Sequence, residues 1–79
     1  MARVRLFAAA AAAAGTKELD STAATLSALK QELAARNDEL ARVLARCTFL
    51  VDGAAVVRDD DRDLTAAEHV DVLPPFAGG

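Results

Sequence analysis

The sequence predicts an α+β fold in which a mixed sheet of about four to five strands carries one main helix on one face. Two patterns favour it. Apolar and polar residues alternate in short runs near both ends of the chain, as in half-buried strands, and between them leucines recur at the spacing of an amphipathic helix. The 79 residues suffice for one small domain with a thin core. We expect that domain at residues 1–73, followed by an extended segment at residues 74–79.

The first strand is predicted at residues 2–7, where Val4 and Leu6 share one face. By the same alternation Phe7 lies on the opposite face, together with two arginines, and is expected to be exposed. Residues 8–14 are all alanine, so they have high helix propensity but no large side chain to bury. They predict a turn or short helix, and a weakly patterned edge strand is expected after it at residues 16–19.

The main helix is predicted from an N-cap among Asp20, Ser21 and Thr22 to about Arg36. Its apolar stripe consists of three leucines at positions i, i+3 and i+7, namely Leu26, Leu29 and Leu33. A second, shorter helix is predicted after the break at residues 37–38. Its inward face is expected to consist of Leu40, Val43, Leu44 and Cys47.

The second half of the chain predicts a hairpin and a last strand. Residues 48–52 and 54–57 flank Asp52-Gly53, a pair typical of two-residue hairpin turns. The last strand is predicted at residues 69–73, with Val70 and Val72 inward. A hairpin, a long helix, a second hairpin and a final strand, with the second helix in the middle connection, make the plan of a β-grasp fold.

The last seven residues carry the most specific pattern, because a strand meets Pro74-Pro75 and the chain then stops on Gly78-Gly79. Proline donates no ladder hydrogen bond and fixes φ at about −65°, so the tail should leave the fold as an extended arm. Six residues can span roughly 20 Å, and glycine, which has no Cβ, can enter a narrow channel. The pattern predicts an arm that carries the terminal carboxylate into a partner. The alternative is a frayed terminus without function.

The tail resembles that of the ubiquitin-like sulfur carriers, and Pro74-Pro75 with Gly78-Gly79 is most similar to the family of molybdopterin synthase small subunits. Weaker similarity runs through residues 4–8, 15–16, 22–29, 49–53 and 63–65. The chain departs from the family where alanines replace an Arg-Glu pair, where Asp52 replaces a frequent Asn, and where Ala67-Glu68 replaces a Gly-Asp turn. A surface contact of the missing arginine is therefore not expected, whereas the tail is intact.

The resemblance implies that the first and last strands lie side by side and parallel at the centre of the sheet. Phe7 and Leu73 would then be adjacent on the solvent face. Because both side chains are large and apolar, we expect them to form a partner interface beside the tail.

The resemblance also implies a function. The chain would be a sulfur carrier and not an enzyme by itself, with Gly79 as the residue that is adenylated and converted to a thiocarboxylate. An adenylating enzyme related to the ubiquitin activators would use Mg-ATP, and a sulfurtransferase would supply sulfur. The tail residues Pro74, Pro75, Phe76, Ala77 and Gly78 would enter the large catalytic subunit of molybdopterin synthase, where a cyclic pyranopterin receives sulfur to build the dithiolene. The carrier itself would bind no cofactor and no metal.

Other functions remain open at this point. The Gly-Gly end is shared with carriers of the thiamine pathway, and a cysteine-biosynthesis carrier is also compatible with it. From different classes, the chain could be a ubiquitin-like modifier that forms isopeptide bonds to lysines, or a non-catalytic interaction module. Thiocarboxylate formation separates a carrier from a module, and covalent conjugates separate a modifier from a carrier.

The composition disfavours some classes of partner and some cellular locations. The net charge is −3, and no basic stripe or set of stacking aromatics is present, so nucleic-acid binding is disfavoured. A single cysteine cannot form an internal disulfide, which favours a reducing cytoplasm. No apolar run approaches the roughly 20 residues that span a bilayer, so no membrane is expected. Two arginines before the alanine run also resemble a short signal peptide, but cleavage there would remove the first strand.

Three further side-chain groups are weak candidates for chemistry. Cys47 completes an apolar stripe, which favours a packed thiol over a nucleophile. His69 is the only histidine and is expected in solvent. The aspartates at 59–61 and 63 lack the spacing of a calcium loop and predict a solvated charged loop.

Overall fold

The structure is a computed structural model that describes residues 1–57 and 60–75. The expectations for Phe76, Ala77, Gly78 and Gly79 lie outside the described residues. In chain order the elements are β1 (Ala2–Leu6), α1 (Ala8–Ala14), β2 (Glu18–Ser21), α2 (Leu26–Ala34), α3 (Asp38–Leu44), β3 (Thr48–Val51), β4 (Ala54–Ala55) and β5 (His69–Leu73).

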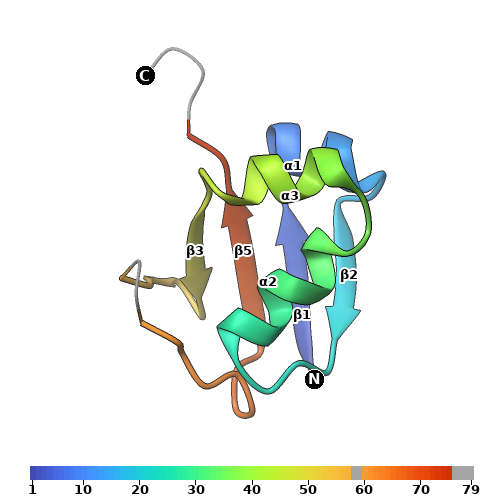
Figure 1. Cartoon of the computed structure of the whole chain (residues 1–79). Coiled ribbons are helices and arrows are strands. Elements are labelled where there is room, and N and C mark those ends of the chain that lie inside the picture. The colour runs from blue at the N-terminus through green and yellow to red at the C-terminus, as the bar shows by residue number, and fades with distance from the viewer. Residues whose placement is uncertain (58–59, 76–79) are drawn as a thin grey trace.

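The strands form one five-stranded sheet in the order β2-β1-β5-β3-β4. The two central strands, β1 and β5, run parallel, and every other neighbouring pair is antiparallel. Figure 1 shows α2 crossing one face of this sheet, with α1 and α3 at the end of the sheet where β5 stops. This is the predicted β-grasp fold, and the parallel central pair implied by the family resemblance is confirmed.

The core lies between the sheet and α2. Alternate residues of the strands point into it and meet the leucine stripe of α2 and the inner face of α3. Its larger members are Val4, Leu6, Leu26, Leu29, Leu33, Leu40, Leu44, Phe49, Val51, Leu64, Val70 and Val72. Burying a side chain of this size contributes about 1.5–3 kcal/mol relative to leaving it exposed. The predicted stripes are therefore correct, although Val43 and Cys47 of the α3 stripe are only half-buried.

The predicted start of the main helix was wrong. β2 lies two residues later than expected and uses Ser21 to pair with Ala2 of β1. The helix therefore begins at Leu26, and its N-cap is Thr25, whose side chain accepts a hydrogen bond from the Ala28 amide at 3.2 Å. The end was also predicted too late, since α2 stops at Ala34.

The hairpin turn was predicted correctly. Asp52 and Gly53 both have positive φ, 49° and 87°, as a two-residue turn between twisted strands requires. The second arm is shorter than expected, because β4 contains only Ala54 and Ala55.

The acidic loop after the hairpin is not simply solvated, as the sequence had predicted. Asp61 accepts hydrogen bonds from the Ser27 amide at 2.8 Å and from the Ser27 hydroxyl at 3.0 Å. Asp63 forms an isolated bridge to Thr25 and accepts from the Thr65 amide at 2.8 Å. These contacts hold the loop against the first turn of α2.

Candidate functional site

The tail leaves the domain from a fixed position. Leu73, the last residue of β5, pairs with Thr48 of β3. On the other side of β5, the Phe7 amide donates a hydrogen bond to the Val72 carbonyl at 3.2 Å. Pro74 is half-buried and Pro75 is exposed. The base of the arm is therefore held from both sides by neighbouring segments, and the two prolines follow directly.

Phe7 and Leu73 lie together at this base. β1 and β5 are parallel with Leu6 opposite Val72, so Phe7 and Leu73 are the next residues along the two central strands. Phe7 is 41% exposed, which is unusual for a phenylalanine, and Leu73 is half-buried. The structure thus places the two predicted interface residues beside each other and next to the tail.

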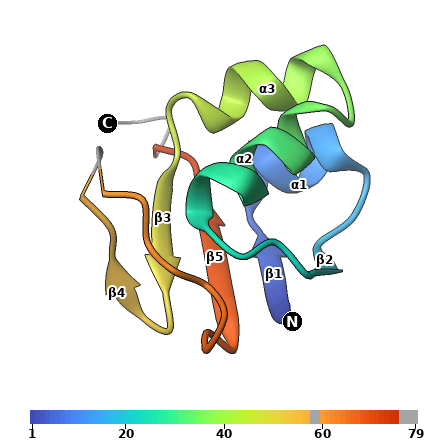
Figure 2. The ribbon, with the colours of Figure 1, turned by 60° about the horizontal axis from the view of Figure 1, so that its bottom comes forward.

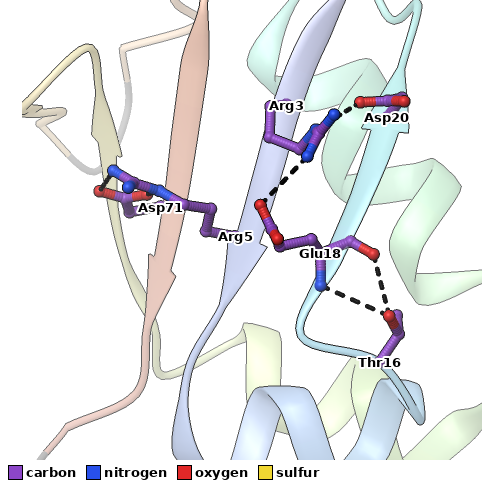
Figure 3. Close-up of polar contacts among 6 residues, drawn as sticks. All are labelled: Arg3, Arg5, Thr16, Glu18, Asp20 and Asp71. Atoms are coloured by element: carbon purple, nitrogen blue, oxygen red, sulfur yellow. Dashed lines mark hydrogen bonds and ion pairs between the residues drawn. The ribbon is translucent and has the colours of Figure 1, made fainter.

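An ion pair occupies the outer face of the two central strands. Arg5 donates from Nε to Asp71 Oδ1 at 2.6 Å and from Nη2 to Asp71 Oδ2 at 3.0 Å, as Figure 3 shows. Asp71 is only 9% exposed. This hydrogen-bonded carboxylate raises the pKa of Arg5 above its ordinary value. This pair was not predicted from the sequence, although strand alternation places both residues on the outer face.

A second, more exposed group of charges lies further from the tail. Arg3 donates to Asp20 at 2.7 Å and to Glu18 at 3.2 Å, and all three side chains are about half exposed or more (Figure 3). Such exposed pairs contribute little to stability. Their position nevertheless distinguishes the two ends of the outer face. One end, beside β2, is charged, and the other end, at Phe7 and Leu73, is apolar and lies where the tail begins.

The remaining candidates do not form a reactive centre. Cys47 Sγ donates to the Val43 carbonyl at 3.2 Å, and partial burial raises the pKa of its thiol, so the thiolate is disfavoured. His69 is exposed, and its backbone amide, not its ring, bonds Asp52. Within residues 1–57 and 60–75, no three side chains of His, Cys, Asp or Glu gather to hold a metal ion. The helices of the described chain are all too short or too polar to cross a membrane.

Comparison with known proteins decides the family. The sequence profile described as the ThiS family matches residues 4–79, which is nearly the whole chain and includes the tail. The chain belongs to the ThiS family of ubiquitin-like sulfur carriers. No curated protein matches this ThiS-family chain.

Solved structures support the same fold for this ThiS-family carrier. The solution structure of the HVO 2177 protein of Haloferax volcanii is 28% identical, with a TM-score of 0.72 over 98% of this chain and 84% of that one. The crystal structure of SAMP1 from Haloferax volcanii is 24% identical, with a TM-score of 0.69 over 98% and 97% of the two chains. At that identity SAMP1 is similar in fold alone.

Membership in the ThiS family gives the general role of this chain. A ThiS-family carrier is not catalytic by itself but works with an activating enzyme and with partner proteins. The described residues supply the base of the tail and a candidate docking surface beside it.

Proposed function

We propose that this ThiS-family carrier is the sulfur-donating small subunit of molybdopterin synthase, with Gly79 as the residue that carries the sulfur. The observation that supports it best is the construction of the tail. The last strand is held between β1 and β3, and Pro74-Pro75, which cannot continue the strand ladder, follow it directly before the terminal Gly-Gly sequence. The Pro-Pro-Phe sequence before Gly-Gly favours the molybdopterin pathway over the thiamine and cysteine pathways.

The chemistry at Gly79 requires a partner enzyme. A carboxylate is ionised at neutral pH and is a poor electrophile, so one of its oxygens must first become part of a leaving group. A carboxylate oxygen attacks Mg-ATP and displaces pyrophosphate, which gives the acyl-adenylate. The persulfide of a sulfurtransferase then displaces AMP and forms an acyl disulfide. A second thiol of that enzyme reduces this S–S bond, which releases the thiocarboxylate and leaves a disulfide on the enzyme. The large subunit finally transfers this sulfur to the cyclic pyranopterin.

In this proposal the carrier contributes positioning. The arm places the terminal carbonyl in the partner's reaction centre, and the two glycines present no side chain to the channel or to the leaving group. Phe7 and Leu73 supply an apolar contact at the start of the arm, where the partner would close over it. The carrier's own side chains take no part in the covalent steps.

The pathway is tested by reconstitution. Carrier bearing a thiocarboxylate at Gly79 is mixed with a molybdopterin synthase large subunit and cyclic pyranopterin, and molybdopterin is measured by its fluorescent oxidation product. We expect molybdopterin from the thiocarboxylated wild-type carrier. We expect none from the same carrier with an ordinary Gly79 carboxylate, or from a variant extended by one residue after Gly79, in which the thiocarboxylate cannot form at Gly79. Sulfur transfer to a thiazole synthase but not to the pyranopterin would assign the carrier to the thiamine pathway instead.

A protein modifier is the second candidate. The ubiquitin-like fold and a terminal Gly-Gly are also the features of modifiers that form isopeptide bonds to lysines. A modifier would produce conjugates that survive boiling in detergent and reductant, whereas a thioester or a non-covalent complex would not. Such conjugates, lost on deletion of Gly79, would favour this function.

A further inference from the structure

A groove lies on the helical side of the sheet, away from the tail surface. It runs between α2, the corner that joins α3 to β3, and the segment after β4, the elements seen around β3 in Figure 2. Its volume is about 640 Å³, within the roughly 300–1,000 Å³ typical of binding pockets. Phe49, which lines it, points to the helical side, whereas Phe7 and Leu73 lie on the outer side. The groove is therefore a second surface, separate from the one proposed above.

The groove has an apolar floor and one exposed apolar side chain. Phe49 and Leu44 lie in the floor and are 4% and 7% exposed. Val57, also in the lining, is 74% exposed, which makes it one of the most exposed large apolar residues in the described chain. An extended segment crossing the groove would cover Val57 and remove its apolar surface from water, which favours binding.

The charged residues in the described part of the groove lining have one sign. Its described lining contains Lys30 and Arg46 but no acidic residue, although the whole chain has a net charge of −3. Lys30 Nζ lies 4.8 Å from the centroid of the Phe49 ring, an arrangement that holds the ammonium group over the floor. In residues 1–57 and 60–75, neither cation forms an ion pair.

Asp60 and Asp61, the described acidic residues nearest to Val57 in sequence, contact other groups and not these two cations. Asp60 lies 3.4 Å from the Arg62 guanidinium, and Asp61 accepts from the Ser27 backbone and hydroxyl. The Cys47 thiol in the lining is likewise engaged, because it donates to the Val43 carbonyl. The groove therefore offers two cations and an apolar floor, and its thiol is not poised for reaction.

We propose that this groove docks an acidic peptide segment of a partner protein. Carboxylates of the segment would contact Lys30 and Arg46, and an apolar side chain between them would pack on Phe49 and Val57. Charge complementarity selects this occupant, since a protein with an acidic surface elsewhere presents two cations here. Two cations are too few for a nucleic-acid backbone, which is recognised by many phosphate contacts. The inference requires neither Gly79 nor sulfur transfer.

The test starts from a phage-displayed library of random peptides, selected against the whole chain. We expect the selected peptides to be enriched in Asp and Glu around one aliphatic or aromatic residue. The strongest peptide, made synthetically, should shift the backbone amide NMR signals of the groove segments and not those of Phe7 and Leu73. Its affinity should fall as the salt concentration rises.

The contribution of the two groove cations is tested by reversing their charge and comparing the variant with a control of the same net charge. K30E/R46E should weaken the peptide roughly tenfold or more, because two attractive contacts become repulsive. The control K17E/R42E makes the same change in net charge at two exposed positions outside the groove lining, and it should alter the affinity much less. If K30E/R46E does not fold by circular dichroism, the neutral variant K30Q/R46Q replaces it and should also weaken binding.

Three results would overturn the proposal. The library could yield no peptide or only peptides without acidic enrichment, the signals that shift could belong to the outer sheet face, or charge reversal in the groove could leave the affinity at the level of the K17E/R42E control. None of these results depends on the sulfur assays. A failure of this inference would therefore leave the proposed function intact, and a failure of the proposed function would leave this inference intact.

Discussion

At the scale of single residues, the Arg5–Asp71 pair explains how a carboxylate is accommodated on the central strand of the sheet. Asp71 is nearly buried on the outer face, and Arg5, from the parallel neighbour, satisfies both of its oxygens. A buried charge without a partner destabilises the fold, so Asp71 requires Arg5. The pair thereby links β1 to β5 two residues before β5 ends and the tail begins.

Replacing either member of this pair should destabilise the domain. We expect Arg5→Ala to lower the urea midpoint of unfolding because it leaves Asp71 unpaired, and Asp71→Ala to lower it less because Arg5 can still reach water. The double variant R5A/D71A should be less destabilised than the sum of the two single variants. A double-mutant cycle measured by chemical denaturation provides the check, and strict additivity would show that the two side chains are not coupled.

Asp52 ties the hairpin turn to the start of β5. Its carboxylate accepts hydrogen bonds from the His69 and Glu68 amides at 2.9 and 3.0 Å, and these bonds lower the pKa of Asp52 below its ordinary value. A folded-state pKa below the unfolded one stabilises the fold above the unfolded value of about 3.9. That stabilisation is lost as the pH falls through the lowered pKa.

Asp52→Asn should therefore reduce the loss of stability that the protein shows as the pH falls into the acidic range. Asparagine keeps an acceptor oxygen and tolerates the positive φ of 49° at this position, but it does not titrate. Urea midpoints measured from neutral pH to about pH 2 should fall less for this variant than for wild type. Parallel curves for the two proteins would mean that the Asp52 carboxylate contributes nothing to acid sensitivity.

Among the elements, α2 supplies the core with a stripe of three leucines. Leu29 and Leu33 are fully buried between the helix and the sheet. Truncating either to alanine should lower the free energy of unfolding by roughly 2–5 kcal/mol, since each change removes buried methyl groups and leaves a cavity. Gln31→Ala, on the exposed side of the same helix, is the control and should change stability little. Unchanged denaturation midpoints for both leucine variants would contradict this packing.

The elements that sequence predicted best are those set by local rules. The Asp52-Gly53 turn follows from residues that tolerate positive φ, and the faces of β1 and β5 follow from simple alternation. The start of α2 was missed because it is decided at long range. Ser21 is taken by pairing with β1, and Asp61, far along the chain, bonds the first turn of the helix.

Phe7 and the tail could be identified from the sequence, whereas the groove could not. Alternation alone placed Phe7 on the outer face, and the Pro-Pro and Gly-Gly pattern marked the tail. The groove with Lys30 and Arg46 was not predictable, because α2, α3 and β3 supply its walls and only tertiary packing brings them together. Arg5 and Asp71 could have been paired once β1 and β5 were expected to be parallel.

At the scale of the whole molecule, the two sides of the sheet have different properties. The outer side carries the ion pairs of Arg3 and Arg5 and the side chains of Phe7 and Leu73, whereas the helical side carries the core and the cationic groove. Figures 1 and 2 show α2 lying across the helical side. A carrier of this size could therefore contact one partner through the tail side while the groove remains accessible.

Phe7→Asp should test the outer docking surface. Because Phe7 is 41% exposed, the variant should fold, and binding to the large subunit and to the activating enzyme should weaken by roughly 2 kcal/mol or more. Ala54→Asp adds the same charge at an exposed residue of β4, outside the groove lining and away from the tail, and should leave that binding unchanged. Calorimetric titration measures both. Loss of folding in Phe7→Asp would show instead that this ring is part of the core.

If this ThiS-family chain carries sulfur on Gly79, the mass of the protein must change on activation. The carrier is incubated with its cognate activating enzyme, Mg-ATP and a sulfur source, and its intact mass and terminal peptide are measured. We expect a gain equal to the exchange of one oxygen for sulfur, located at Gly79, and no gain in a variant extended by one residue. Unmodified wild-type protein, or sulfur found on Cys47 instead of Gly79, would contradict the claim.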